Sequence, residues 1–387
     1  MRKTCLVILL FVTVCCAAQK TFQKNFGGDK FDRALFIDHT SDGGYIICGY
    51  SNSFNINNSY DMYVVKLDEA ATIQWQKTFG GSRTDIGWGI QELKDKTYLL
   101  FGGMGVDSTN DDIFITRLDA SGNKLWERSY GGPAYERCTQ MIQTSDNNFV
   151  FIGQRNSKDG NIDSYILKID GNGNLIWEKT FGGPAIERTF YGAEIPGGDL
   201  LISGLTLPHG NNKADIYFIR LNKNGESVWN KTYGEKDVHE IVHSFCMNSD
   251  KKTYTLTGYS ETTKEGFHEG LFLQIDENGN VVKKQTHNNN EDLRLMHAEL
   301  TNDGGFVVTG YTRKDIVNEI SDAVLLEFDK DGKVKWLKTF GDADKDDQGY
   351  WIVINKDGSY TFVGYTHSAG KNGDILLIKT NAVGELN

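Results

Sequence analysis

Apolar and polar residues alternate along the chain in short runs, and clusters of glycine, asparagine and aspartate separate these runs. Alternation with a period of two predicts half-buried β-strands, and Asp/Asn/Gly clusters favour tight antiparallel hairpins. In one representative unit we predict strands at residues 138–144, 149–154, 164–169 and 175–181. Tight turns join the first pair and the last pair, and a longer segment joins the second strand to the third.

The fourth strand of this unit carries the motif L-I-W-E-K-T-F-G-G, and copies of it recur along almost the whole chain. The copy at residues 281–287, V-V-K-K-Q-T-H, is degenerate. The first glycine of each copy, or its equivalent, is Gly27, Gly80, Gly131, Gly182, Gly234, His287 or Gly341. A period of about 50 residues is typical of propeller blades. Seven units of four antiparallel strands predict an all-β fold, a seven-bladed β-propeller.

The two ends of the chain complement each other. Residues 21–26 form an unattached copy of the fourth strand, whereas the seventh unit ends without a tryptophan strand. We therefore predict that the N-terminal strand completes the last blade and closes the ring, which leaves no open repeat end. Residues 19–387 are assigned to this one propeller domain.

Three kinds of residue recur at fixed positions, and we interpret them as structural. A glycine lies inside each second strand, and tryptophans of the fourth strands could pack over these glycines between blades. An acidic residue begins each third strand, where we expect it to bond loop amides. The glycines are Gly49, Gly102, Gly153, Gly204, Gly258, Gly310 and Gly364, the tryptophans are Trp75, Trp126, Trp177, Trp229 and Trp336, and the acids are Asp61, Asp112, Asp163, Asp215, Glu269, Asp322 and Asp374.

Residues 1–18 differ from the repeats. A basic start, an apolar run at 6–14 and small residues at 16–18 are typical of a signal peptide, with cleavage expected before Gln19. The run is shorter than the ~20 residues of a membrane-spanning helix, so we expect no membrane insertion. Lipid attachment at Cys15 or Cys16 stays open. We predict a protein that is secreted, periplasmic or displayed on the cell surface.

Charge and cysteine content exclude several classes of function. The net charge of −11 is spread along the chain without a basic cluster, which argues against nucleic acid or an anionic membrane as partner. The cysteines after the signal segment, Cys48, Cys138 and Cys246, are odd in number and far apart. They show no disulfide framework or metal-ligand spacing, so we expect buried small residues. We expect a monomer.

The combination of D-x-Y-[VIL]-[VIL]-K-[LI]-D with W-x-K-T-F-G-G resembles secreted bacterial β-propeller repeat proteins. The resemblance covers the chain after the signal segment, and it implies an interaction module without a shared chemistry. The pattern D-x-x-G-x-x-x-W at 119–126 and 170–177 is more distantly similar to the tryptophan-docking repeats of quinoprotein propellers. The vicinal cysteine pair that quinoprotein alcohol dehydrogenases carry at the cofactor has its counterpart here only at Cys15 and Cys16, in the signal segment. We therefore expect no quinone cofactor.

Residues 239–243 read H-E-I-V-H and match the zinc-protease motif H-E-x-x-H. Their register places them on the first strand of the fifth unit, aligned with residues 187–191. Residues four apart on a strand are separated by about 13 Å, too far to share one zinc ion. We predict no metal site, and leave metal binding by His239 and His243 as the open alternative.

A further acidic residue follows most glycine anchors by about five positions, which predicts a ring near one mouth of the central channel. One interpretation is structural, because a group repeated in nearly every blade can bond neighbouring amides. The other is an acid and base pair for a polysaccharide hydrolase or lyase. In three units an arginine follows the acid, as in Asp32-Arg33. The candidate residues are Asp32, Asp85, Glu136, Arg137, Glu187, Arg188, Glu240 and Asp346.

The leading functional interpretation is a non-enzymatic interaction propeller that binds carbohydrate or protein through its loops. Candidate loop residues are Asn57, Tyr60, His209 and His268. The alternative is a secreted polysaccharide hydrolase or lyase with an acidic site at the channel mouth. An asymmetric set of acidic, arginine and histidine residues at that mouth would favour the enzyme, and a uniform lining would favour binding. No cofactor is predicted, although the acidic mouth leaves room for structural calcium.

Overall fold

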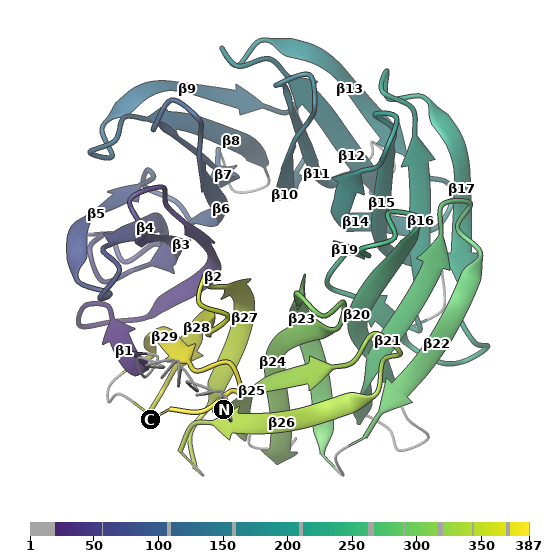
Figure 1. Ribbon diagram of the computed structural model, residues 1–387. Helices are drawn as coiled ribbons and strands as arrows, with labels where there is room; N and C mark the ends of the chain where they lie inside the picture. The colour runs from purple at the N-terminus through teal and green to yellow at the C-terminus, as the bar shows by residue number, and fades with distance from the viewer. Residues whose placement is uncertain are drawn as a thin grey trace, which may run out of the picture.

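The computed structural model forms a closed ring of seven β-sheets around a central axis (Figure 1). It describes residues 20–55, 57–106, 110–156, 160–208, 212–261, 267–288, 291–315, 320–342, 344–368 and 372–386. The predicted seven-bladed β-propeller is confirmed. The signal segment, the cysteines at 15 and 16 and the cleavage site lie outside the described residues. No helix of the described ranges has the length and apolar character needed to cross a membrane.

Each blade runs from an inner strand beside the channel to an outer strand at the rim. Blade 1 contains β2 (Asp32–His39), β3 (Tyr45–Ser51), β4 (Asp61–Leu67) and β5 (Ile73–Phe79). Blade 2 contains β6 (Asp85–Glu92), β7 (Tyr98–Gly105), β8 (Asp111–Leu118) and β9 (Lys124–Tyr130). Blade 3 contains β10 (Glu136–Gln143), β11 (Phe149–Asn156), β12 (Ile162–Ile169) and β13 (Leu175–Phe181). Blade 4 contains β14 (Ile186–Glu194), β15 (Leu200–Leu207), β16 (Asp215–Leu221) and β17 (Ser227–Tyr233).

The remaining three blades follow the same plan, with two departures. In blade 5 the inner strand is split, and in blade 7 the outer strand comes from the other end of the chain. Blade 5 contains β18 (Glu240–Val242), β19 (Cys246–Met247), β20 (Thr253–Glu261), β21 (His268–Asp276) and β22 (Val281–His287). Blade 6 contains β23 (Asp292–Leu300), β24 (Phe306–Asp315), β25 (Ile320–Phe328) and β26 (Val334–Phe340). Blade 7 contains β27 (Asp347–Ile354), β28 (Tyr360–Thr366), β29 (Asp374–Thr380) and β1 (Phe22–Phe26).

Ring closure depends on β1, the first strand of the chain. It pairs antiparallel with β29, from Phe22 opposite Lys379 to Phe26 opposite Ile375. Phe22 and Phe26 pack against the apolar cluster that blade 7 shares with blade 1. The prediction that the N-terminal strand completes the last blade is confirmed.

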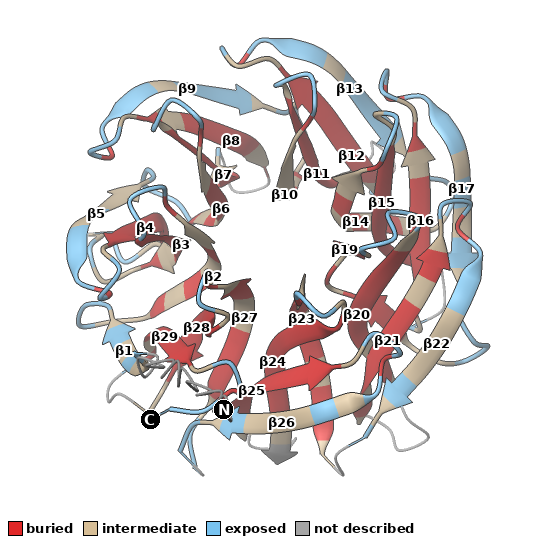
Figure 2. Cartoon of the chain, in the orientation of Figure 1, coloured by how far each residue is buried: buried red, intermediate tan, exposed pale blue. Residues whose placement is uncertain are grey.

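The core lies between the blades rather than within one sheet. Figure 2 shows buried residues concentrated in the inner and middle strands, whereas outer strands such as β9 and β13 are mostly exposed. One cluster combines Ile47 and Val65 of blade 1 with Val363 and Leu377 of blade 7, all fully buried. Each such side chain contributes about 1.5–3 kcal/mol relative to an exposed one. Apolar faces therefore hold neighbouring blades together around the whole ring.

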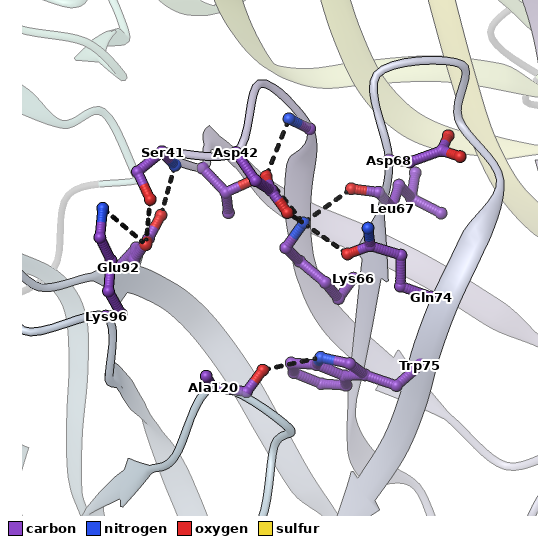
Figure 3. A network of polar contacts seen from close by, with 12 residues as sticks. Ser41, Asp42, Lys66, Leu67, Asp68, Gln74, Trp75, Glu92, Lys96 and Ala120 are labelled. Carbon is purple, nitrogen blue, oxygen red and sulfur yellow. Dashed lines mark hydrogen bonds and ion pairs between the residues drawn. The ribbon is translucent and has the colours of Figure 1, made fainter.

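Trp75 shows how the tryptophan of an outer strand packs against the next blade. Its ring lies against Gly122, in the hairpin turn that joins the third and fourth strands of blade 2, and its Nε1 donates to the carbonyl of Ala120 (3.2 Å; Figure 3). Gly122 has a φ of 76°, and an added Cβ would lie 2.9 Å from the tryptophan ring. The turn needs glycine for both reasons. The pairs that repeat this contact are Trp126 with Gly173, Trp177 with Gly225, Trp229 with Gly279 and Trp336 with Gly384.

The prediction that the tryptophans cover the second-strand glycines is therefore wrong. Those glycines face the inner strand of their own blade, where a β-bulge interrupts the pairing between Ala34 and Phe36. A Cβ on Gly49 would lie 1.9 Å from the carbonyl oxygen of Arg33, and the equivalent clash recurs in every blade. The bulge brings the inner-strand backbone close, so only glycine fits there.

The lysine of the third-strand motif is a buried cation that bonds groups of its own blade, as Lys66 shows. Lys66 is 2 % exposed and its Nζ reaches Asp42 (2.8 Å), the carbonyl of Leu67 and Gln74 (Figure 3). In the same turn, the amide and hydroxyl of Ser41 donate to the Glu92 carboxylate of blade 2. These contacts tie the turn at one end of blade 1 to its own sheet and to its neighbour.

Candidate functional site

The predicted ring of acidic residues is buried and bonds the backbone. Asp32, Asp85 and Glu136 begin inner strands, and their carboxylates accept hydrogen bonds from the amides of Gly28 (2.8 Å), Gly81 (2.7 Å) and Gly132 (3.2 Å). Glu187 accepts from Gly183 in the same way (3.1 Å). The ring members Asp32, Asp85, Glu136, Glu187 and Glu240 are at most 8 % exposed. They fix the connections between blades.

Burial raises the pKa of two of these acids, Asp85 and Glu136. It raises the pKa of Asp85 to about 6, against the opposing effect of the amides of Gly81 and Gly105. Burial also raises the pKa of Glu136, although the guanidinium of Arg155 lies 2.9 Å from its carboxylate. Both carboxylates are thus bonded to groups of the fold, Asp85 to backbone amides and Glu136 to an amide and to Arg155.

One member of the predicted ring was misplaced by one residue. Asp347, rather than Asp346, begins β27 and accepts from the amide of Asp342. Asp346 instead accepts hydrogen bonds from Tyr365 and Ser321 at the seam with blade 6. Asp347 follows its anchor Gly341 by six positions, as Glu240 follows Gly234 in blade 5, whereas a count of five positions ends one residue early, at Asp346.

The H-E-I-V-H segment lies on the inner strand of blade 5, as its register predicts. Glu240 accepts from Ser260 and pairs with Lys284 (2.8 Å). His239 accepts a hydrogen bond through Nδ1 from the amide of Ala214 (3.0 Å). Within the described ranges, no group of three or more His, Cys, Asp or Glu side chains is arranged to hold a metal ion.

The predicted loop residues are dispersed. Asn57 is exposed, and its amide donates to the side chain of Asn55. Tyr60 is half-buried beside Tyr50 and Phe31. His268 is buried and bonds Asp292 through Nδ1 (2.8 Å). His209 lies outside the described residues.

The structure brings Arg137 and Arg188 together with Arg33 around a cavity of about 360 Å³ in the central channel. Each arginine directly follows a ring acid on an inner strand. Because successive side chains of a strand point to opposite faces of the sheet, the acid and the arginine lie on opposite faces of their blade, and the arginine lines the channel. The other residues that line the cavity are Leu35, Tyr50, Ile86, Trp88, Thr139, Gln154, Phe190, Tyr191, His243, Met296, Tyr350 and Trp351.

Aromatic rings hold the channel arginines in place. The guanidinium of Arg33 lies 4.3 Å from the ring centre of Tyr350 and donates to the hydroxyl of Tyr50 (3.1 Å). Arg137 lies 5.4 Å from the ring centre of Trp88 and 5.1 Å from that of Tyr135. Cation–π contacts of this kind position a guanidinium without neutralising its charge.

No carboxylate in the described lining of the cavity compensates its positive charge. The described lining contains no aspartate or glutamate, and none of the three arginines there pairs with a carboxylate elsewhere in those ranges. The Nε groups of Arg33 and Arg188 are buried without a hydrogen-bond partner among the described residues. Burial lowers the pKa of Arg188, and the charge of Arg137 lowers it further. Unmet buried donors of this kind are rare in folded proteins.

His243 adds a neutral polar group to the cavity. Its ring stacks between Phe190 and Tyr259, and its Nε2 has no hydrogen-bond partner within the described ranges. Burial lowers the pKa of His243 to about 4, and the nearby Arg294 acts in the same direction. The imidazole is therefore uncharged at neutral pH and can donate or accept one hydrogen bond.

A second cavity of about 200 Å³ adjoins the first, and Thr139 and Trp351 line both. Here the charged groups are carboxylates, Asp38 and Glu299. Burial raises the pKa of Asp38 to about 6 and that of Glu299 to about 7, and the proximity of Asp38 raises the latter further. The channel is thus basic in one compartment and acidic in the next.

Sequence reasoning identified Arg137 and Arg188 but expected an acidic mouth around them. It missed the aromatic residues of the lining. The inner-strand position that holds Arg33, Arg137 or Arg188 can be recognised from its pairing partner. In each blade this position pairs with the residue that follows the second-strand glycine, and that residue is often tyrosine. The pairs are Arg33 with Tyr50, Ile86 with Gly103, Arg137 with Gln154, Arg188 with Leu205, Ile241 with Tyr259, Arg294 with Tyr311 and Gln348 with Tyr365.

No family model matches the sequence, and no curated protein matches it either. Solved structures do match in shape. The WD40 domain of Neurospora crassa Pan2 has a TM-score of 0.56 at 9 % identity, over 90 % of this chain and 89 % of that one. A periplasmic gluconolactonase of Pseudomonas aeruginosa has a TM-score of 0.55 at 11 % identity, over 88 % of this chain and 96 % of that one.

A puromycin hydrolase S511A mutant has a TM-score of 0.59 at 10 % identity, over 92 % of this chain. The chain spans about half of that hydrolase, 53 % of its length. These proteins include a WD40 domain and two enzymes, so the likeness extends to the fold and not to one activity. By this likeness the chain is similar to proteins of the β-propeller fold.

Proposed function

We propose that the protein is an extracellular or periplasmic binding propeller whose central channel holds an acidic carbohydrate. The observation that carries the proposal is the set of Arg33, Arg137 and Arg188 around one aromatic-walled cavity without a compensating carboxylate in its described lining. A carboxylate or sulfate placed there accepts hydrogen bonds from the guanidinium groups. Such charge-assisted bonds are about twice as strong as neutral ones.

The walls favour a sugar over a bare inorganic anion. Trp88, Tyr191 and Trp351 supply flat apolar surfaces, against which the C–H faces of a pyranose ring can stack. Gln154, Thr139 and His243 supply polar groups for hydroxyls. A cavity with apolar walls and a few placed polar groups is the usual form of a small-ligand site.

A hydrolase or lyase with an acidic site at the channel mouth fits the geometry less well. Glu136 and Glu187, which could supply an acid and a base, bond the amides of Gly132 and Gly183 instead of facing the cavity. The arginine and histidine residues of the lining are nevertheless distributed unevenly among the blades, which is the asymmetry expected of an enzyme. Product formation is therefore measured alongside binding.

The location outside the cytoplasm rests on residues 1–18, whose basic start and short apolar run are typical of a signal peptide. Mass spectrometry of the protein recovered from its native host tests this part separately. An N-terminus at Gln19 supports export. An intact N-terminus in the cytoplasmic fraction contradicts it.

Calorimetric titration tests the ligand class, with galacturonate, galactose 6-sulfate and galactose as probes. We expect binding of one or both acidic sugars and none of galactose. Arg188→Gln removes one charge-assisted contact, so the affinity should fall about 10- to 100-fold. Arg128→Gln is the matched control, because Arg128 lies exposed on outer strand β9.

Three results would contradict the proposal. Binding of galactose with the same affinity as the acidic sugars would show that the charge of the ligand is not recognised. Binding of an acidic peptide in place of the sugars would show that the ligand is not a carbohydrate. Release of shorter products from polygalacturonate would identify an enzyme rather than a binding module.

A further inference from the structure

We propose that the binding site continues out of the channel over an aromatic shelf at the seam of blades 7 and 1, so that the ligand is an oligomer. The shelf consists of Phe31, Tyr50, Tyr60, Tyr365 and His367. This inference rests on the proposed function, because it assigns the acidic sugar of the channel to the end of a longer chain. It adds the units that follow.

The five rings form one connected group. Phe31 lies between the two blades, with its ring centre 6.0 Å from those of Tyr50 and Tyr60 and 5.9 Å from that of Tyr365. Tyr50 and Tyr60 meet edge to face at 5.2 Å, and His367 lies 5.5 Å from Tyr365. Tyr60, Phe31 and His367 are each partly exposed. Rings packed in this way form a rigid surface with little entropy to lose on binding.

Arg33 joins the shelf to the channel. Its guanidinium donates to the Tyr50 hydroxyl (3.1 Å) and lies 4.7 Å from the ring centre of Tyr365, while its side chain lines the cavity. Tyr50 itself belongs both to the cavity lining and to the shelf. A ligand group bound at Arg33 is therefore next to two rings of the shelf, those of Tyr50 and Tyr365.

Polar groups border the shelf where hydroxyls of a sugar chain would lie. The side chain of Asn52 accepts from the amide of Phe31, and Ser53 accepts from the amide of Lys30. The Lys30 ammonium bonds Asn58 (2.9 Å), so this edge carries a positive charge. Aromatic faces with polar edges suit stacked sugar rings, and the lysine suits a further acidic unit of the same chain.

Two probes of different length test the shelf: galacturonate, which can fill only the channel, and its tetramer. With the unmodified protein we expect the tetramer to bind at least 10-fold more tightly in calorimetric titration. Tyr60→Ala should remove most of this gain and leave galacturonate affinity unchanged. Tyr60→Phe keeps the ring and should keep the gain. Arg188→Gln should weaken both probes equally.

The outcomes separate the two proposals. Equal affinity for monomer and tetramer in the unmodified protein would overturn the shelf while the channel site stands. Failure of galacturonate, its tetramer and galactose 6-sulfate alike would overturn the proposed function itself. A Tyr60→Ala protein that loses galacturonate affinity together with thermal stability would assign Tyr60 to packing, which also overturns the shelf. An Arg128→Gln protein, altered at an exposed residue of outer strand β9, serves as the control.

Discussion

Glu136 and Arg137 are neighbours on the same inner strand, yet they belong to different parts of the molecule. Glu136 is fully buried, bonds the amide of Gly132 and pairs with Arg155. Arg137 lines the channel, where its guanidinium lies near the rings of Trp88 and Tyr135. Glu136 stabilises the fold through its hydrogen bond and ion pair, whereas Arg137 has no carboxylate beside it in the described cavity lining.

The same division applies to the whole ring. An acid beside the connection between blades recurs in most blades, and a tryptophan packs over the turn of the next blade in five of them, because every blade must be joined to the next. The arginine position varies, with Ile86 in blade 2 and Gln348 in blade 7. Repetition therefore marks groups that hold the ring together, and departure from it marks groups that are free to bind a ligand.

The largest expected effect comes from breaking the buried pair. Glu136→Ala leaves the Arg155 guanidinium and the Gly132 amide without their acceptor, so the free energy of unfolding should fall by about 3–5 kcal/mol. Arg137→Ala removes a charge that has no counterion in the described lining, and should change stability by about 1 kcal/mol or less. Urea denaturation of both variants measures the difference. Similar losses for the two would show that the division between neighbours is wrong.

A smaller effect is expected at the contact between outer strand and turn. Trp177→Ala uncovers Gly225 of the next blade and should lower the free energy of unfolding by about 3 kcal/mol, at the low end for large aromatic residues because the ring is only partly buried. Leu175, on the same strand but 47 % exposed, is the control. We expect Leu175→Ala to cost less than about 1 kcal/mol in the same denaturation experiment. If Leu175→Ala lowers the free energy of unfolding as much as Trp177→Ala does, the contact between Trp177 and Gly225 does not stabilise the ring.

The smallest expected effect concerns the acidic compartment and its pH dependence. Glu299 has a pKa of about 7 in the fold against an ordinary 4.5, so between these values the folded state binds more protons than the unfolded chain. The free energy of unfolding should therefore fall as pH rises from about 4.5 to 7, by on the order of 2–3 kcal/mol. Glu299→Gln should flatten this slope, leaving the weaker contribution of Asp38. A slope unchanged in the variant would exclude Glu299 as its source.

The number of blades, their strands and the closing role of the first strand could be predicted because local patterns set them. The period of the W-x-K-T-F-G-G motif gives the count, and alternation gives the strands. Contacts between repeats were harder to predict. Trp75 packs on Gly122 because the outer strand of one blade meets the turn of the next, and that geometry depends on how the ring closes.

The channel illustrates the same limit. Sequence spacing placed an acidic residue near most inner strands, but the face to which it points follows from the pairing register. Once Asp32 is directed toward Gly28, Arg33 must face the channel. The longer connection before Asp347 could not be recognised by counting, because the shift appears only in the pairing of β27 with β28.

The pairing of β1 with β29 has a consequence for synthesis of the chain. β1 is made before every other strand of blade 7, so this blade cannot be completed until β29 (Asp374–Thr380) has been synthesised. Until then the growing array presents the open face of its newest blade. Closure of the ring therefore follows the synthesis of β29, and any fragment that stops before Asp374 lacks the strand with which β1 pairs.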